Sequence, residues 1–422
     1  LTNNIKQIQW EITKTFISKP DNDTTNNQIN NVITMLEESN NNITKYPLAF
    51  IPVVIKDNLN TIDYNTTAGT PGMKDFRPSV DATLVKKIRD AGGIIFGKAN
   101  MHELARGTST DNAFFGRCLN ACDFFDPETN EFVLTNETTL DPDVLLSPGG
   151  SSGGTATAVA AGFAPIGLCS DTGCSCRLPG AYQGVIGYRP TINRYFTDGT
   201  VPLSNLRDVV GIIAQKMDDL ITLDTVLSDA DDDDIIVPET FRVVALYDWF
   251  LNDDTNPIVS ESFNLTLKYL DTLDNIEVIY DFDTEIERVL QSAPTDYDFP
   301  RDFRQFIEVY NVPKSYYEII NESLISFDSI ENAYPVSPKV YHTYLNQRTS
   351  AVAWWTKYLK DNNYDAFVYP ASKFETPKVG TTNGGCAQNM GLTPSLGFPS
   401  ISVPGYKILD SGFDVGFEIA GL

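Results

Sequence analysis

The sequence predicts an α/β fold, because strand-like and helix-like segments alternate along its first half. Residues 48–55 form an apolar, partly β-branched run that is typical of a buried strand. Residues 82–91 carry apolar side chains at helical spacing, and the glycines at 92–93 end this predicted helix. Residues 94–96 form a second short apolar run. Strand, helix and strand in this order indicate a sheet that is covered by helices.

Further segments extend this alternation along the chain. Residues 5–17 and 29–36 have apolar side chains at near-helical spacing and predict two surface helices joined by a polar linker. Residues 207–228 form a long amphipathic segment that we interpret as a helix. The remaining predictions are helices at 155–162 and from 179, strands at 164–168, 243–246, 276–279, 364–369 and 401–403, a surface excursion at 118–147 and a mostly helical region at 285–360.

Composition and charge narrow the class of protein. The chain has 422 residues, of which 42% are hydrophobic, enough for one large core or two of ordinary size. Its formal net charge of -25 repels phosphates, so we expect no nucleic-acid partner and no anionic membrane surface. The acidic run at 231–234 is interpreted as a solvated loop. No apolar run reaches the roughly 18 residues of a membrane span, and the sequence does not open with a signal-peptide pattern.

Cysteine and histidine usage bears on redox state and metals. The six cysteines, an even number, permit disulfides and favour a secreted or lumenal protein, with the cytoplasm as the alternative. Cys118 and Cys122 lack the second cysteine or histidine pair that a zinc site needs. Only two histidines are present, His102 and His342. We therefore expect no metal and no cofactor, and a histidine triad only if one of the two lies near a nucleophile.

Two glycine-rich loops carry the most specific chemical signal. Residues 149–154 read Gly-Gly-Ser-Ser-Gly-Gly and open a segment of small residues, so backbone N–H groups crowd one point. A second loop, Gly-Cys-Ser at 173–175, follows the predicted strand at 164–168. Neither loop ends in Gly-Lys-Ser/Thr, which excludes a Walker-type phosphate loop.

At these loops the chain resembles a known family, the amidase-signature hydrolases. The family pattern is approximately Gly-Gly-Ser-Ser-Gly-Gly, a stretch of small residues, and then Asp-Thr-Gly-Gly-Ser-Ile-Arg-x-Pro. This chain has Asp171-Thr-Gly-Cys-Ser-Cys-Arg-Leu-Pro179 as its second motif, and Ser151 lies 24 positions before Ser175, as in the family. Further matches follow in the family's order: Ile51-Pro-Val-Val-Ile-Lys-Asp-Asn58, Thr66-Thr-Ala-Gly69, Gly97-Lys-Ala-Asn-Met-His-Glu103, Gly184-Val-Ile-Gly-Tyr-Arg-Pro-Thr191 and Gly397-Phe-Pro-Ser-Ile-Ser-Val-Pro404.

The resemblance implies one large α/β/α domain with a central, mixed and twisted sheet covered by helices. Residues 1–45 would form a helical segment packed on this domain, which would span residues 46–422. Its core would cover 46–228, a variable helical region on the substrate side about 285–360, and the closing strands 361–422. Family members usually continue with a final helix or two, so we expect a C-terminal tail to be missing from the sequence.

The family's catalytic roles carry over to three positions. Ser175 would be the nucleophile, Ser151 the bridging serine that follows a cis peptide bond, and Lys56 the base. A serine hydroxyl needs a neighbour to take its proton, and lysine can do so only when neutral. Because the ordinary pKa of lysine is about 10.4, burial would have to lower it by about 3 pH units. A lone lysine at a strand end usually reaches solvent, and only the family pattern reverses that interpretation.

Further positions would support the reaction. Four consecutive backbone N–H groups would form the oxyanion hole: those of Thr172, Gly173, Cys174 and Ser175. Ser152 would support the hydrogen-bond network, while Asp171 and Arg177 would hold the loop. For Asp57 and His102 we expect structural roles.

The sequence departs from the family pattern beside the nucleophile. The family usually has glycine where Cys174 stands and an aliphatic residue where Cys176 stands. A side chain at position 174 would narrow the oxyanion hole or change the backbone angle, and so alter or abolish activity. Neighbours two apart in an extended loop point opposite ways, so we do not expect these cysteines to pair with each other. Cys169, Cys118 and Cys386 stay open as partners.

Three functions follow from these observations. The first is an amidase that cleaves a small organic amide, aryl or acyl, and releases ammonia or an amine; residues 198–208 resemble those of aryl-acetamide and mandelamide-type hydrolases. The second is the amidotransferase subunit that supplies ammonia for tRNA-linked glutamine, against which the net charge argues. The third is a catalytically silent binding or structural protein, which Cys174 would explain. A homo-oligomer is compatible with each.

Overall fold

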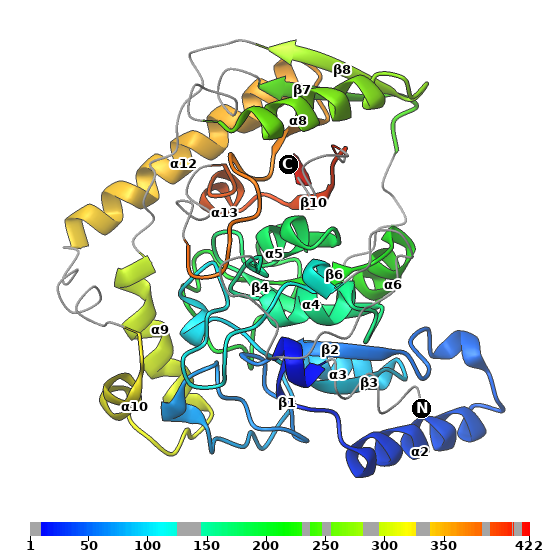
Figure 1. Cartoon of the computed structure of the whole chain (residues 1–422), viewed down its shortest axis with the longest axis vertical. Coiled ribbons are helices and arrows are strands. Elements are labelled where there is room, and N and C mark those ends of the chain that lie inside the picture. The colour runs from blue at the N-terminus through cyan, green and yellow to red at the C-terminus, as the bar shows by residue number, and fades with distance from the viewer. Residues whose placement is uncertain are drawn as a thin grey trace.

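A single sheet runs through the molecule in the computed structural model (Figure 1). The structure describes residues 10–124, 145–229, 237–246, 255–281, 295–325, 338–381, 389–406, 408 and 416–422. The sheet has eleven strands in the order β1-β3-β2-β4-β6-β5-β10-β11-β9-β7-β8. Their bounds are β1 Phe16–Ser18, β2 Pro52–Lys56, β3 Ile94–Ala99, β4 Ile166–Asp171, β5 Ile186–Arg189, β6 Val209–Ala214, β7 Phe241–Leu246, β8 Ile276–Asp281, β9 Ala366–Pro370, β10 Ser400–Pro404 and β11 Gly416–Ala420.

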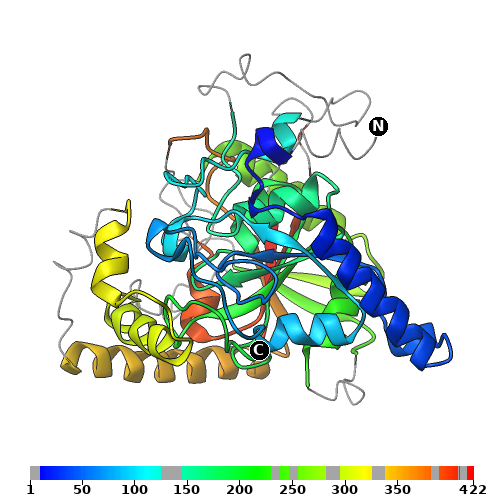
Figure 2. The same ribbon diagram turned by 90° about the horizontal axis from the view of Figure 1, so that it is seen from below.

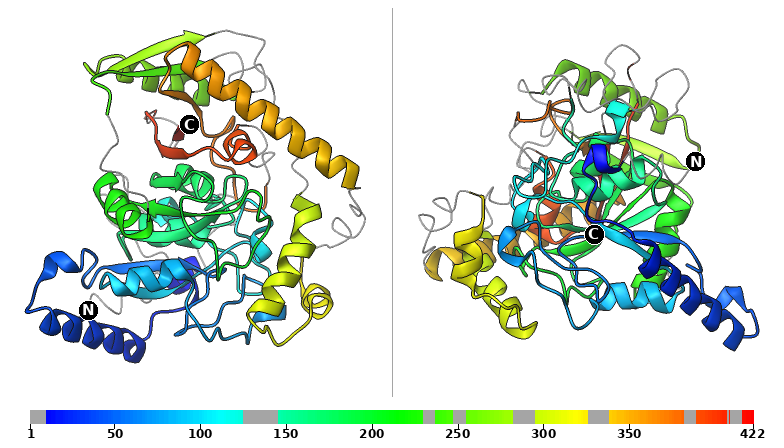
Figure 3. Two further views of the ribbon diagram at one scale, coloured as in Figure 1. Left: turned by 180° about the vertical axis from the view of Figure 1, so that it is seen from behind. Right: turned by 60° about the horizontal axis from the view of Figure 1, so that its bottom comes forward.

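The sheet combines parallel and antiparallel pairs. Strand β2 is parallel to β3 and β4, and β7 is parallel to β8 and β9. The pairs from β4 through β6, β5, β10 and β11 to β9 are antiparallel. Figure 3 shows the C-terminal strands, in red, between the two halves of the molecule. The predicted α/β class with a mixed central sheet is confirmed.

Helices cover both faces of this sheet. Because successive side chains of a strand point to opposite faces, one strand contributes to two cores. Val53 and Ile55 of β2 pack with α3 and α6, whereas Val54 packs on the side of α4. In the other half, Val244 packs with α12 and Val243 with α8. The helices are α2 Asn22–Glu38, α3 Thr83–Asp90, α4 Gly153–Ala160, α5 Arg177–Tyr182, α6 Met217–Leu227, α8 Pro257–Leu270, α9 Thr295–Val309, α10 Tyr316–Glu322, α12 Pro338–Asp361 and α13 Leu392–Leu396.

Local sequence signals set the ends of several helices. Asp21 caps α2 by accepting a hydrogen bond from a backbone N–H of its first turn. Ser315 and Glu318 form a capping box at the start of α10. After α3, Gly92 has a φ of 85°, a left-handed conformation that favours glycine. The helix predicted at 82–91 and its glycine stop are therefore confirmed.

Two helix predictions are wrong in part. Residues 207–228 are predicted as one helix, but residues 209–214 form β6 and only residues 217–227 form α6. Strand β6 lies between β4 and β5 and is buried along its whole length. A short apolar run fits such a strand as well as a helix. Of residues 5–17, residues 10–13 are helical, whereas residues 16 and 17 lie in β1, which pairs with β3. The patterns also failed to predict β5, β11 and α13.

Some predictions fall on parts of the chain that the structure does not describe. These are the acidic loop at 231–234, most of the excursion at 118–147, the start of the first predicted helix and the position of Cys386. The division into an N-terminal segment, core, variable region and closing strands stays a prediction. Within the described residues, no helix is both long and apolar enough to cross a bilayer.

Helices α9, α10 and α12 lie on one side of the molecule (Figures 1 and 2). Phe299 and Phe303 of α9 pack in one cluster with Leu203. The hydroxyl of Ser204 also donates to Asp298 of α9 at 2.7 Å. These contacts attach the helical region to the segment at 200–208, which lies beside the candidate site.

Candidate active site

Lys56 lies where strand β2 ends. Strand β2 is parallel to β4, and Ile55 is paired with Leu168, so both strands end at the same edge of the sheet. This places Lys56 beside Ser170 and Asp171, the last two residues of β4. The side chain of Lys56 is fully buried.

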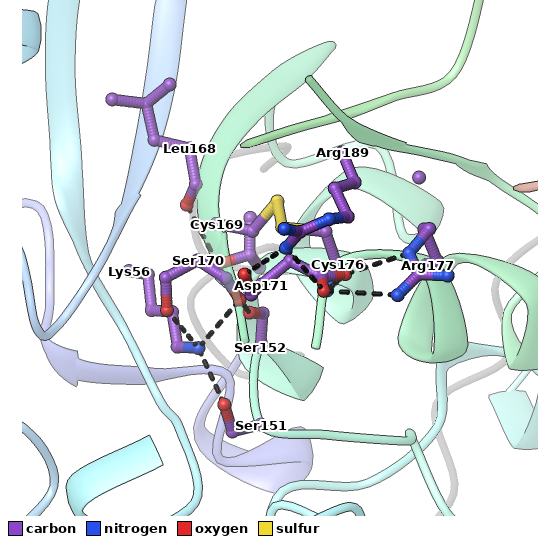
Figure 4. The surroundings of a disulfide bond; sticks show 12 residues. Lys56, Ser151, Ser152, Leu168, Cys169, Ser170, Asp171, Cys176, Arg177 and Arg189 are labelled. Carbon is purple, nitrogen blue, oxygen red and sulfur yellow. Dashed lines mark hydrogen bonds and ion pairs between the residues drawn. A yellow bond between two sulfur atoms is a disulfide. The ribbon is translucent and has the colours of Figure 1, made fainter. Parts of the chain in front are cut away.

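The amine of Lys56 contacts two serine hydroxyls (Figure 4). Its Nζ donates to Oγ of Ser151 at 2.7 Å and to Oγ of Ser170 at 2.8 Å. Burial lowers the pKa of Lys56 to about 7, although the charges of Asp171 and Asp208 raise it in part. The neutral and charged forms are therefore both populated near neutral pH. Ser170 was missed by sequence reasoning, because nothing along the chain separates it from an ordinary strand serine.

The loop at 149–154 fits tightly against its neighbours. The peptide bond between Gly150 and Ser151 is cis, as the resemblance implied. A Cβ atom on Gly150 would lie 2.7 Å from the backbone nitrogen of Ser109, and one on Gly154 would lie 2.4 Å from the carbonyl oxygen of Asn100. Only glycine permits such close backbone approach. The glycines therefore allow Ser151 to lie between β2 and the segment at 100–110.

Ser152 connects the two glycine-rich loops. Its backbone N–H donates to the carbonyl oxygen of Ser175 at 3.2 Å, and its hydroxyl donates to the carbonyl oxygen of Ser170 at 3.3 Å. Among the described residues, no hydrogen bond joins the hydroxyls of Ser151 and Ser175. The structure thus brings Lys56, Ser151 and Ser152 into one hydrogen-bonded group and holds Ser175 beside it through its backbone.

The loop at 172–175 leaves backbone N–H groups available. Those of Thr172, Gly173 and Ser175 have no acceptor within the part of the chain that the structure describes. The rest of the loop is held, because the Thr172 hydroxyl donates to Asp208 and the Gly173 carbonyl accepts from Arg177 at 2.7 Å. The loop is therefore anchored, and the three residues with these N–H groups line one cavity.

Cys174 does not narrow the cavity beside Ser175. Its side chain is fully buried in a cluster with Leu178 and Met390, and it is not among the residues with a positive φ. Cys174 is disulfide-bonded, and Cys176 forms a disulfide with Cys169, one of the partners that the sequence left open (Figure 4). The predicted obstruction by this side chain is wrong, because the side chain packs into the core.

Ser175 lines a cavity of about 250 Å³. Ser175 is 7% exposed and lies in the wall of this cavity, where a ligand can approach it. A cavity of this size suits a small organic molecule. The other described residues of the wall are Ala105, Arg106, Gly107, Thr108, Thr172, Gly173, Leu203 and Arg207.

A buried network of charges supports the nucleophile loop. Arg177 forms ion pairs with Asp171 at 3.1 Å and with Glu418 at 2.8 Å, and Arg189 pairs with Asp171 at 3.3 Å. Burial raises the pKa of Asp171, but the two arginines outweigh it and lower the pKa to about 2. The Asp171 carboxylate also accepts from the backbone N–H of Cys176, next to Ser175. Arg189 lies in the motif at 184–191, but neither it nor Glu418 was predicted to support the nucleophile loop, since their contacts with Asp171 and Arg177 arise only in the folded chain.

Asp57 and His102 make contacts that fit the structural roles expected for them. Asp57 accepts from the backbone N–H of Thr67 at 3.0 Å and pairs with the buried Lys98 at 3.4 Å. The backbone N–H of His102 donates to the carbonyl oxygen of Ser151 at 3.1 Å. Burial lowers the pKa of the His102 imidazole to about 4, so it is neutral at physiological pH. In the described ranges, no cluster of three or more His, Cys, Asp or Glu side chains could hold a metal ion.

Comparison with known proteins agrees with this fold. The Amidase family matches residues 11–278. The indoleacetamide hydrolase of Allorhizobium ampelinum is 28% identical over 391 residues, which cover 88% of this chain and 80% of that protein. The mandelamide hydrolase of Pseudomonas putida is 27% identical over 412 residues, which cover 89% and 75%. A crystal structure of an amidase shares the fold, with a TM-score of 0.78 and 23% identity over 100% of this chain and 91% of the other.

The chain belongs to the Amidase family, whose match covers well over half of its length. It is an amidase, an enzyme that hydrolyses carbon–nitrogen amide bonds.

Proposed function

We propose that Ser175 is the nucleophile of this amidase, that Lys56 is its base and that Ser151 passes the proton between them. The observation that carries this proposal is the 2.7 Å contact between Nζ of Lys56 and Oγ of Ser151 in a fully buried position. Burial lowers the pKa of Lys56 to about 7, which makes a neutral amine available as a base near neutral pH.

The proposed reaction has two halves. Neutral Lys56 takes the proton of Ser151, which takes that of Ser175, while the Ser175 oxygen forms a bond to the amide carbon. The N–H groups at 172–175 stabilise the oxyanion. The carbon–nitrogen bond then breaks, and the proton returns through Ser151 to the leaving nitrogen, which departs as ammonia or an amine. Water hydrolyses the acyl-enzyme by the same relay, which releases a carboxylic acid and restores Ser175.

Three further contacts support this arrangement. Ser170 accepts the second hydrogen bond of Lys56, and Ser152 holds the loop of Ser175, so both would be positioning residues. The disulfide joins Cys169, which precedes Ser170, to Cys176, which follows Ser175. We infer that this bond fixes Ser170, which contacts the base, relative to the nucleophile.

The substrate we propose is a small organic amide, either aryl or acyl. The cavity of about 250 Å³ beside Ser175 has room for such a molecule. Two relatives are named for hydrolysis of indoleacetamide and mandelamide. Both names denote small organic amides.

Exposure to a fluorophosphonate is expected to add one covalent group to the folded wild-type enzyme and none to Ser175→Ala. The reagent phosphonylates an activated serine hydroxyl, and Ser175 is the hydroxyl that would be activated. Intact-mass analysis measures the adduct, and release of ammonia from a panel of aryl, acyl and peptide amides measures turnover. Ser109→Ala, which changes a serine outside the proposed relay, is the matched control. An absent adduct on folded wild type would favour the silent binding protein instead.

Activity is expected to rise with pH through an apparent pKa near 7 and then level off, because only neutral Lys56 accepts a proton. Asp208→Asn should move this rise in activity to lower pH by up to about one pH unit. The charge of Asp208 favours protonated Lys56, and removing that charge makes the neutral amine available at lower pH. The profile of kcat/KM between pH 5 and pH 9 measures both effects. A shift to higher pH would contradict the assignment of Lys56 as the base.

A further inference from the structure

We propose that Arg207 binds a carboxylate of the substrate, so that this amidase acts on short amides whose acyl part carries a carboxylate. This inference rests on the proposed function of Ser175 and adds a substrate class to it. Arg207 lies in the segment at 198–208, from which a substrate type was predicted, but in none of the motifs from which the catalytic residues were predicted. It is followed by Asp208 and then by strand β6, and it lines the same cavity as Ser175.

The guanidinium of Arg207 is buried but poorly paired. The residue is 8% exposed. Its Nη2 makes one long hydrogen bond, 3.4 Å to the hydroxyl of Ser395, and its buried Nε has no partner among the described residues. Arginine keeps its positive charge at every physiological pH. Because an unpaired buried charge is costly, this side chain is arranged to receive a ligand.

Neighbouring carboxylates do not neutralise Arg207. The hydroxyl group of Tyr344 and the carboxylates of Asp171 and Asp208 act electrostatically on it. Asp171 already forms ion pairs with two other arginines. Asp208 accepts hydrogen bonds from the Thr172 hydroxyl and from two backbone N–H groups. Arg348 adds a like charge nearby. The positive charge of Arg207 is thus directed at the cavity.

The charge of the cavity is opposite to that of the whole chain. The chain carries a formal net charge of -25, which repels anions from most of its surface. The charged side chains in the described wall of the cavity are nevertheless both arginines, Arg106 and Arg207. The positive charge of Arg207 beside the proposed nucleophile would attract an anionic substrate locally.

A carboxylate is the anion that fits best. A guanidinium presents parallel N–H donors that match the two oxygens of a carboxylate. The cavity of about 250 Å³ holds both Arg207 and Ser175, so the carboxylate would lie only a few carbon atoms from the scissile carbonyl. Monoamides of short dicarboxylic acids have this geometry. Their hydrolysis would release ammonia and a dicarboxylate.

The first test compares succinamic acid with succinamide, in which a neutral carboxamide replaces the carboxylate. The measured quantity is the ratio of the two kcat/KM values. Wild type is expected to prefer succinamic acid, and Arg207→Gln should lower the ratio about 10- to 100-fold. Arg207→Lys should lower the ratio less, because lysine keeps the positive charge and lacks only the parallel N–H donors of the guanidinium. Lys86→Gln, which removes one exposed positive charge on α3, should leave the ratio unchanged. Partial unfolding of a variant lowers both rates equally and cancels in the ratio.

A second test separates this inference from the role of Ser175. Calorimetry measures the Kd of succinamic acid for Ser175→Ala with and without Arg207→Gln, and we expect binding to weaken at least about 10-fold when Arg207 is replaced. Equal binding, or a wild type that prefers succinamide, would overturn the carboxylate subsite. Binding that depends on Arg207 in an enzyme that fluorophosphonate does not label would instead refute the role of Ser175 and keep the subsite.

Discussion

Lys56→Met is expected to lower kcat/KM by about 10³- to 10⁴-fold, because it removes the proposed base while it fills the same buried space. Steady-state release of ammonia measures this loss. Methionine keeps the length and apolar stem of lysine, so the loss would report the missing amine rather than a cavity.

The same substitution is expected to change how stability depends on pH. The pKa of buried Lys56 is lowered from 10.5 to about 7. In the unfolded chain the pKa is near its ordinary value, so the folded state bears the cost of a buried charge, roughly 4–5 kcal/mol, below pH 7. As pH rises from 7 towards 10.5, folded Lys56 is neutral while the unfolded chain still binds the proton. Wild-type stability should therefore gain over this range, and Lys56→Met should lack that gain.

Urea unfolding at pH 6 and pH 9.5 measures this difference. The free energy of unfolding of Lys56→Met, relative to that of wild type, should be higher at pH 6 than at pH 9.5. Lys86→Met, at a largely exposed position on α3, is the control and should show no such change with pH. A constant difference between Lys56→Met and wild type at both pH values would contradict a lowered pKa at Lys56.

Arg177→Met is expected to destabilise the fold by about 3–5 kcal/mol, because it leaves the buried carboxylate of Glu418 without its cationic partner. Of its two arginine partners in the described structure, Asp171 would keep Arg189. Activity should fall as well, since Arg177 donates to the carbonyl of Gly173 in the nucleophile loop. The free energy of unfolding in urea measures the first effect, and kcat/KM measures the second.

Two further variants sharpen this prediction. Arg177→Met combined with Glu418→Met should recover part of the stability, because no unpaired charge is then left at that position. Arg117→Met breaks an ion pair with Asp111 in which both side chains are partly exposed, and it should cost less than about 1 kcal/mol. If Arg177→Met cost no more than Arg117→Met, the buried network would not be what holds the loop.

The sequence predicted the site best where its residues belong to short, continuous motifs. The loop at 149–154 and the loop at 171–179 are each local, and their glycine and serine positions are readable without tertiary information. The structure brings Ser151 to Lys56, although 95 positions separate them along the chain. The roles of Lys56, Ser151 and Ser175 stay proposals that the labelling and pH experiments test.

The fold was predictable where periodicity and caps agree. The helix at 82–91, its glycine stop and the following strand are confirmed as α3, Gly92 and β3. The segment at 207–228 was misread because six apolar residues in a row do not distinguish a helix from a strand that is covered on both faces. Residues 209–214 form a strand because they pair with β4 and β5 on either side. These partners come from other segments of the chain, so the local apolar pattern does not reveal them.

By itself, the sequence determined the α/β class and the order of the glycine-rich loops, and its family resemblance implied the candidate relay of Lys56, Ser151 and Ser175. Only the tertiary structure decided the environment of these groups. Ser170, Asp208 and Arg207 enter the site because strands and loops from distant parts of the chain meet at one edge of the sheet. The lowered pKa of Lys56 has the same origin, since desolvation depends on everything that packs around a charge and not on the residues beside it in sequence.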